Sequence, residues 1–277
     1  MITATSTATA STLKITVENL MPTNGGVVTP FWFGLHDGSF NTFDLGAPAS
    51  SGIEHVAEDG LTGLENTLPG NENFEINDFF QFDSTIADLF QNSNAGMNGG
   101  LQDLVTGENM PVLGIFPGEI GTATVNVDQQ NISNNRFFSY ASMFFPSNDA
   151  FIADDNPIEI FDSAGNFIGA DLIVFGNQVW DAGTEVNDED LSTVPFTLDS
   201  IAQGVEEGGV VTVHPGLQPV GSGGLLDFGN GAFANGDFTV DGFQVARITI
   251  AQVPEPATTV GLLVLGGLFF IRRRVAS

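Results

Sequence analysis

The alternation of hydrophobic and polar residues along this chain predicts β-strands. Residues 13–17 and 122–127 place apolar side chains at every second position, which is the pattern of a strand with one buried face. Residues 29–35 form a further predicted strand that is rich in aromatic residues. Residues 136–145 are apolar on both faces, which is typical of a central strand covered on both sides. Four more strands are predicted at residues 157–161, 167–175, 210–214 and 244–251.

Two short helices are predicted among these strands. The first begins at residues 51–54, whose sequence Ser-Gly-Ile-Glu has the spacing of a capping box. The second is predicted to follow Asp83 as its N-cap, inside an Asn- and Phe-rich insertion at residues 71–100. The side chains expected to face the core are Ile53, Val56, Ala57, Ile86, Leu89 and Phe90.

The order of these elements predicts the fold class. Turns rich in Gly, Asn and Asp separate the strands, and the chain has no internal repeat. This pattern favours an all-β protein, an antiparallel β-sandwich with short helices in inserted loops. We expect residues 13–251 to form one domain, with an N-terminal segment at residues 1–12 and a C-terminal segment at residues 252–277.

Composition limits the function classes. The 42% hydrophobic content and 25 Phe residues are sufficient for a sizeable core in a chain of 277 residues. The absence of cysteine excludes disulfides, thiol catalysis and cysteine-ligated metal centres. The formal charge is −28, and the body without its C-terminal segment has 33 acidic and three basic residues, a charge of −30. Such a body repels nucleic acid and anionic membranes, and it attracts cations.

The C-terminal segment has three parts. Residues 253–256 read Val-Pro-Glu-Pro, residues 257–271 are apolar and uncharged, and Arg272, Arg273 and Arg274 follow. The apolar run is shorter than the usual span of about 20 residues, but with tilt and its flanking residues it can cross a membrane. The arginines would stay on the cytoplasmic side, which places the body outside the inner membrane. The alternative is a buried C-terminal element, in which three terminal arginines would have no role.

This three-part order resembles the bacterial PEP-CTERM sorting signal. The resemblance implies that an exosortase-type enzyme cuts near the Pro-Glu-Pro motif and discards the helix. The protein would then be exported to the cell surface or the extracellular space, with residues 257–271 as a transient anchor in the inner membrane. Residues 1–12 lack the basic region and apolar core of an export signal. We expect either a start codon assigned too late or a signal that has been removed.

Two acidic turns are the candidate site for chemistry. Asp149 ends the turn Pro-Ser-Asn-Asp after the predicted central strand, and residues 181–185 read Asp-Ala-Gly-Thr-Glu. Carboxylates that converge at one end of a sandwich suit calcium, which takes about six to eight oxygen ligands in flexible geometry. In a chain with 34 acidic residues, two acidic turns are also compatible with solvated loops that bind no ion.

These two turns, with residues 138–143 before the first of them, resemble the spondin domain, in its prokaryotic branch. The segments His-Asp-Gly-Ser-Phe at 36–40, 54–60 and His-Pro-Gly at 214–216 also resemble that family, from about residue 13 to residue 251. The resemblance implies a β-sandwich with a metal site whose ligands here are Asp149, Asp181 and Glu185. Glu185 stands where the family usually has Asp, and its longer side chain can still bind a metal.

The histidines are the other candidates. His36, His55 and His214 could pair with acidic neighbours, but the chain has no His-Glu-x-x-His spacing and no Gly-x-Ser-x-Gly turn. We therefore assign no catalytic residue and expect no enzyme. A structural role is the simpler interpretation of each histidine.

The expected function is that of a non-catalytic, Ca²⁺-binding protein of cell adhesion or the extracellular matrix. Its partners would be an extracellular polysaccharide or a surface protein, with no nucleic acid. Two alternatives stay open: a metal-assisted hydrolase of extracellular polymer with a histidine base, and a structural surface-coat protein whose calcium only stabilises the fold.

Overall fold

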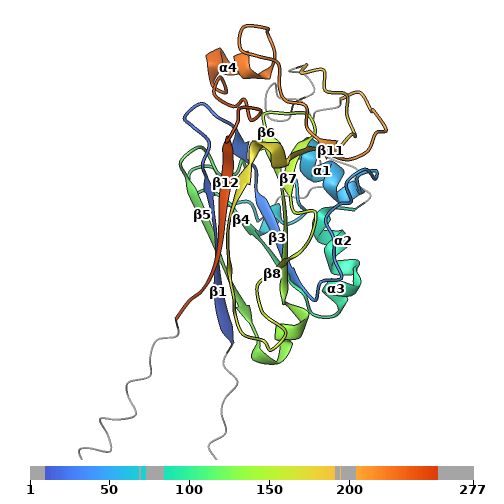
Figure 1. Cartoon of the computed structure of the whole chain (residues 1–277), viewed down its shortest axis with the longest axis vertical. Helices are drawn as coiled ribbons and strands as arrows, with labels where there is room; N and C mark the ends of the chain where they lie inside the picture. Colours follow the sequence, from blue (N-terminus) through green and yellow to red (C-terminus); the bar gives the residue numbers. More distant parts are fainter. Residues whose placement is uncertain (1–9, 69, 73–83, 191–193, 195–203, 255–277) are drawn as a thin grey trace, which may run out of the picture.

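The structure is a computed structural model that describes residues 10–68, 70–72, 84–190, 194 and 204–254. Its strands form two antiparallel sheets packed face to face, and the helices of residues 51–59, 86–92 and 94–97 lie on one outer side (Figure 1). This architecture confirms the predicted all-β sandwich. The α-helices are α1 (Ser51–Asp59), α2 (Ile86–Asn92), α3 (Asn94–Met97) and α4 (Phe228–Gly231), and 3₁₀ turns span Glu65–Thr67, Gln129–Asn134, Gly176–Gln178 and Leu225–Asp227.

The smaller sheet has the strand order β5-β1-β12-β9. Its strands are β1 (Ser11–Asn19), β5 (Ile120–Val127), β9 (Ala170–Phe175) and β12 (Gln244–Gln252). Ile15 of β1 pairs with Ile250 on one side and with Ala123 on the other, so the two ends of the body share one sheet. The alternation predicted for residues 13–17 is confirmed, and β1 begins two residues before the expected boundary.

The larger sheet has the order β11-β10-β7-β6-β3-β4, and two short strands also pair with β6. Its strands are β2 (Val27–Val28), β3 (Phe31–His36), β4 (Leu101–Val105), β6 (Phe137–Phe145), β7 (Ala150–Ala153), β8 (Ile158–Glu159), β10 (Val179–Asp181) and β11 (Thr212–Val213). β6 occupies the middle of this sheet, as its two apolar faces predict.

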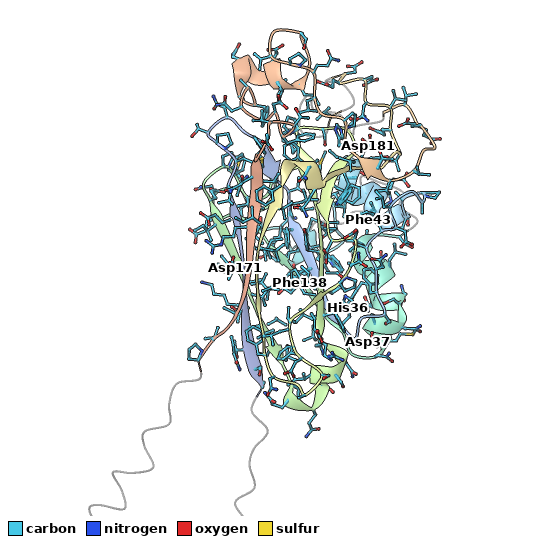
Figure 2. The ribbon with its side chains drawn as sticks, viewed as in Figure 1. His36, Asp37, Phe43, Phe138, Asp171 and Asp181 are labelled. Carbon is cyan, nitrogen blue, oxygen red and sulfur yellow. The ribbon has the colours of Figure 1, made fainter. Side chains whose placement is uncertain are left out.

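The two faces of the larger sheet have different partners. Phe31, Phe33 and Leu35 of β3 point into the core between the sheets, where Phe138 also lies (Figure 2). Trp32 points the other way and packs with Ile53 and Phe90 beneath the helices. Each face therefore buries a separate apolar cluster, and the alternation along β3 decides which side chain joins which cluster.

The helix starts differ from the prediction by a few residues. The N-cap of α1 is Ser50, whose hydroxyl accepts from the Ile53 N–H, and not the first residue of the 51–54 motif. The N-cap of α2 is Thr85, which forms a capping box with Asp88. Asp83, the predicted cap, lies outside the described residues. The expected inward side chains of both helices are buried except Leu89, which is half-buried.

The single domain stays a prediction, and calorimetry can check it. Because β1 and β12 join the two ends of the body in one sheet, residues 13–251 should unfold in one cooperative transition. Differential scanning calorimetry should show one peak whose calorimetric and van't Hoff enthalpies agree. Two separated peaks, or a stable protease fragment that ends near residue 100, would contradict the prediction.

None of the helices in the described residues is long and apolar enough to cross a membrane. The apolar run at residues 257–271 lies outside the described part of the chain.

Candidate metal site

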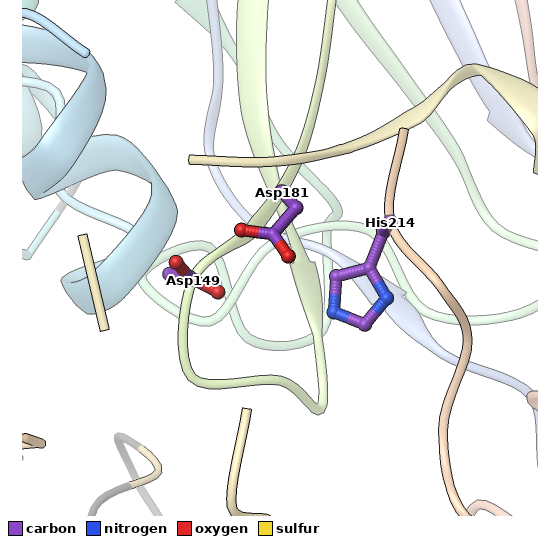
Figure 3. A group of neighbouring side chains, drawn as sticks. All are labelled: Asp149, Asp181 and His214. Atoms are coloured by element: carbon purple, nitrogen blue, oxygen red, sulfur yellow. The ribbon is translucent and has the colours of Figure 1, made fainter. Parts of the chain in front are cut away.

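Three buried side chains converge at one end of the larger sheet. One ligand atom each from Asp149, Asp181 and His214 lie within 4.8 Å of one another. Their exposed fractions are 0%, 6% and 4%, so all three lie below the surface. Figure 3 shows the two carboxylates and the imidazole ring turned toward one another. The group comes from the β6–β7 turn, the end of β10 and the residue after β11.

Asp149 joins the two acidic turns that the sequence singles out. Its Oδ2 accepts hydrogen bonds from the backbone N–H groups of Thr184 (3.1 Å) and Glu185 (3.2 Å). Its own carbonyl accepts from the Ala182 N–H at 3.1 Å. Among the described residues, Oδ1 is buried and has no hydrogen-bond partner. One oxygen of Asp149 therefore has a structural role, and the other is free to bind a ligand.

Asp181 is held by its place in the sheet and by the turn that follows. It pairs with Ala150 of β7 and with Thr212 of β11. Its Oδ1 accepts from the Gly183 N–H at 2.7 Å, and its Oδ2 accepts from the Asn187 side-chain amide at 2.6 Å. Gly183 has φ of +67°, which a side chain would strain, so the turn depends on glycine.

The third member, His214, has a defined tautomer. Its Nδ1 accepts a hydrogen bond from the Gly216 N–H at 3.0 Å, so the neutral ring carries its proton on Nε2. This Nε2 is buried, faces the carboxylates in Figure 3 and has no hydrogen-bond partner in the described part of the chain. The ring therefore presents an N–H donor toward the two carboxylates.

His36 has the same local turn and serves as an internal comparison. Its Nδ1 also accepts from the N–H two residues later, that of Gly38, at 3.0 Å. Its Nε2 lies 3.0 Å from the Ser139 hydroxyl, which accepts the proton. Figure 2 shows that His36 lies far from Asp181, toward the other end of the sandwich. The donor of His36 is therefore satisfied within the protein, whereas that of His214 is not.

Burial sets the electrostatics of the group. Burial and the neighbouring Asp181 carboxylate raise the pKa of Asp149 to about 7, although two backbone hydrogen bonds lower it. Burial lowers the pKa of His214 to about 4, so its ring is neutral at neutral pH. Of the three basic residues in the body, Arg136 pairs with Glu159, Arg247 pairs with Asp171, and Lys14 lies on β1. No described protein cation therefore neutralises the two carboxylates.

Glu185, the third predicted ligand, lies beside the group but outside it. Its Oε1 accepts from the Gly204 N–H at 2.5 Å, and its Oε2 is buried without a partner in the described residues. Burial raises its pKa to about 7, and Asp59, Asp188 and Glu54 add to the increase. The structure thus brings together Asp149 and Asp181, and the third member of their group is His214 instead of the predicted Glu185.

A further set of acidic residues on α1 borders Glu185. Burial raises the pKa of Glu58 to about 8, and the Glu185 carboxylate contributes to the increase. Asp59 is 7% exposed and lies 3.6 Å from Nδ1 of His55. His55 is therefore part of this helix surface and not of the group around Asp149.

The donor set fits a divalent cation. Asp149 contributes an oxygen that forms no hydrogen bond with any described residue, and Asp181 contributes a second carboxylate. Hard carboxylate oxygens suit Ca²⁺, and a group of two carboxylates and one imidazole also suits transition metals. The hydrogen bond from the Gly216 N–H to Nδ1 favours Ca²⁺ over a transition metal. Nε2 can ligate a metal only after its proton moves to Nδ1, and that hydrogen bond would then be lost.

Comparison with known proteins identifies the C-terminal segment. Residues 252–275 match the PEP-CTERM protein-sorting motif. The motif marks an exported protein that is sorted by exosortase, as the sequence predicts. No curated protein sequence matches this chain significantly. The matched segment does not extend into residues 13–251, so the resemblance of the body to the spondin domain stays a hypothesis.

Processing of the tail can be measured directly. Because the motif precedes the apolar run and the arginine cluster, we expect secreted protein to lack residues 257–277. Mass spectrometry of protein from the culture medium should give a C-terminus near the Pro-Glu-Pro motif. Substitution of Arg272, Arg273 and Arg274 by Gln should leave unprocessed protein in the membrane fraction. Intact tails on secreted protein would contradict this prediction.

Proposed function

We propose that this exported protein binds one Ca²⁺ ion at Asp149 and Asp181, and that the bound ion orders the loops used in cell adhesion or matrix assembly. The observation that supports the proposal is the buried Asp149 Oδ1 beside a second carboxylate: no described residue forms a hydrogen bond with this oxygen, and no described cation neutralises either carboxylate. Two buried carboxylates repel each other, and a divalent ion would remove that repulsion.

His214 would act as a hydrogen-bond donor and not as a metal ligand. Its Nε2–H faces the carboxylates while Gly216 occupies Nδ1. Such a donor can bind the oxygen of a water molecule that completes the coordination of a hard cation. Direct ligation of zinc would require the proton to move to Nδ1 and the Gly216 hydrogen bond to break. This arrangement therefore favours Ca²⁺ over Zn²⁺.

Burial of the group supports an organising role for the ion. Asp149, Asp181 and His214 are each at least nine-tenths buried, so a partner has little access to a bound ion. The ion would instead fix the β6–β7 turn against the segment after β10, which Asp149 already connects. The partner, an extracellular polysaccharide or a surface protein, would contact the ordered loops.

The metal-assisted hydrolase is the second candidate, because an imidazole lies within 4.8 Å of the two carboxylates. Such a site needs a base and an entrance for the polymer. The neutral ring could accept a proton only after it loses the proton on Nε2 or releases Nδ1 from Gly216. The carboxylates do not line the large pocket beside His214.

Retention in the matrix tests the proposal. The wild-type protein should remain with cells or matrix in Ca²⁺ and be released by EDTA. The Asp149→Asn variant should be released in both conditions, and Asp155→Asn, which changes an exposed acid outside the group, should behave as wild type. Isothermal titration with Ca²⁺ should show one site that Asp149→Asn abolishes. Calcium binding without Ca²⁺-dependent retention would leave the surface-coat role. Metal-dependent release of reducing sugar or peptide from purified matrix would support the hydrolase.

A further inference from the structure

A pocket of about 560 Å³ lies beside His214. Its walls come from the β9–β10 turn and from residues 238–243, which precede β12. Ligand pockets in proteins are commonly about 300–1,000 Å³, so the volume is sufficient for a small organic ligand. Of the candidate metal site, only His214 lines this pocket, and Asp149 and Asp181 do not.

Backbone contacts hold the pocket walls in place. The Gly176 N–H donates to the Phe243 carbonyl at 2.9 Å and so joins the two walls. A Cβ atom on Gly176 would overlap the Phe238 carbonyl oxygen, so only glycine fits there. The Phe238 ring packs edge-on against His214, with 5.2 Å between ring centroids. The pocket is therefore formed before any ligand arrives, which limits the entropy lost on binding.

The lining combines exposed apolar side chains with one carboxylate. Phe175, Val213 and Val240 are 37%, 50% and 58% exposed, and they come from three separate segments. Apolar side chains that gather at a pocket mouth indicate contact with a ligand. Asp241 lies in the same lining and is exposed, and no described residue forms a hydrogen bond or ion pair with its carboxylate. Among the described residues, the lining contains no Lys or Arg.

We propose that this pocket binds the ammonium group of an organic cation. An alkylammonium ion has an apolar surface for the Phe and Val side chains and a positive charge for Asp241, and aromatic rings attract such cations. A hydrated metal ion would gain nothing from the apolar rim. An anion would be repelled by Asp241 and by a body of charge −30. A neutral sugar would fit the volume but would leave the carboxylate uncompensated.

The positive charge of the ligand is the feature to test. Choline and 3,3-dimethylbutan-1-ol have nearly the same shape, and only choline is charged. Saturation-transfer NMR and calorimetry on the purified full-length protein should show that choline binds about five- to tenfold more tightly than the alcohol. Nα-acetyl-lysine amide, tested in parallel, distinguishes a small quaternary ligand from the lysine side chain of a partner protein.

Matched variants locate the binding. Asp241→Asn should reduce choline affinity about five- to tenfold and leave binding of the alcohol unchanged. Asp155→Asn, which removes one charge outside the pocket, should leave both affinities unchanged. Phe175→Ala should weaken the binding of both ligands. These outcomes do not require Ca²⁺ and should persist in EDTA, so their failure is distinct from failure of the metal site. Equal binding of choline and the alcohol, equal effects of the two Asp variants, or preferential binding of methyl β-glucoside would overturn the proposal.

Discussion

Calcium is expected to raise the unfolding temperature of the protein, and Asp149→Asn should abolish that increase. A ligand that binds only the folded state at a hundredfold excess over its Kd stabilises it by about 2.7 kcal/mol. For a domain of this size, that corresponds to roughly 5–10 °C. The affinity should lie in the range of extracellular calcium modules, with a Kd of roughly 10⁻⁴ to 10⁻³ M.

Asp149→Asn is a more specific test of the calcium site than Asp181→Asn. The amide oxygen can still accept from the Thr184 and Glu185 N–H groups, while the NH₂ group replaces the unpaired Oδ1. The variant should therefore keep the turn, lose the ion and gain stability without calcium, because it removes a buried charge. Asp181→Asn should also lose the ion, but its new NH₂ group would face the Asn187 amide donor. We expect Asp181→Asn to gain less stability without calcium.

Thermal melts in four solutions check these expectations. Wild type, both variants and Asp155→Asn should be compared in EDTA, calcium, magnesium and sodium chloride. If the site is specific, calcium should raise the unfolding temperature only of wild type and of Asp155→Asn. If the acidic body of charge −30 were only screened, magnesium or high salt would stabilise all four proteins equally. Equal calcium shifts in Asp149→Asn and wild type would eliminate the site.

Without calcium, the protein should lose stability as the pH rises from 6 to 8.5. Burial raises the pKa of Glu58 to about 8, and it raises the pKa values of Asp149, Asp154 and Glu185 to about 7. The folded state therefore binds more protons than the unfolded chain in this range, so the free energy of unfolding falls with pH. Because Glu58 and Asp154 are only half-buried and solvent screens part of their interactions, we expect a total loss of roughly 3 kcal/mol.

Two buried histidines oppose part of this trend at lower pH. Burial lowers the pKa values of His36 and His214 to about 4, so below pH 6.5 the unfolded chain binds more protons at these residues. Their contribution to stability is present above pH 6.5 and is lost as the pH falls toward 4. Between about pH 4.5 and 6.5 the two histidines therefore offset only part of the effect of the four carboxylates, and the maximum of stability should lie below pH 6.

Melts at half-unit pH steps measure this profile. Calcium should flatten the upper limb, since it holds Asp149 in its charged form, and Asp149→Asn should flatten the same limb without calcium. Glu58→Gln should remove a separate part of the slope that calcium does not affect. A flat profile from pH 6 to 8.5 in EDTA would contradict the raised carboxylate pKa values and, with them, the strain that calcium is expected to relieve.

The sequence by itself determined the β-sandwich fold and the sorting motif in the C-terminal segment. Alternation at residues 13–17 predicted β1, and the two apolar faces of residues 136–145 predicted the central strand β6. Both signals are local, because the side-chain period of two reports burial directly. The sorting motif at residues 252–275 is likewise a contiguous pattern, so its recognition requires no structure.

Only the tertiary structure decided which side chains share the site. Asp149 and Asp181 meet because β7 pairs with β10, and His214 joins them because β11 pairs with β10. Glu185 follows the same turn, yet the Gly204 N–H holds its carboxylate toward the acidic residues of α1. The His-x-Gly pattern at residues 36–38 and 214–216 is visible in the sequence. Whether its Nε2–H meets a serine or two carboxylates depends on long-range strand pairing, which spacing along the chain does not encode.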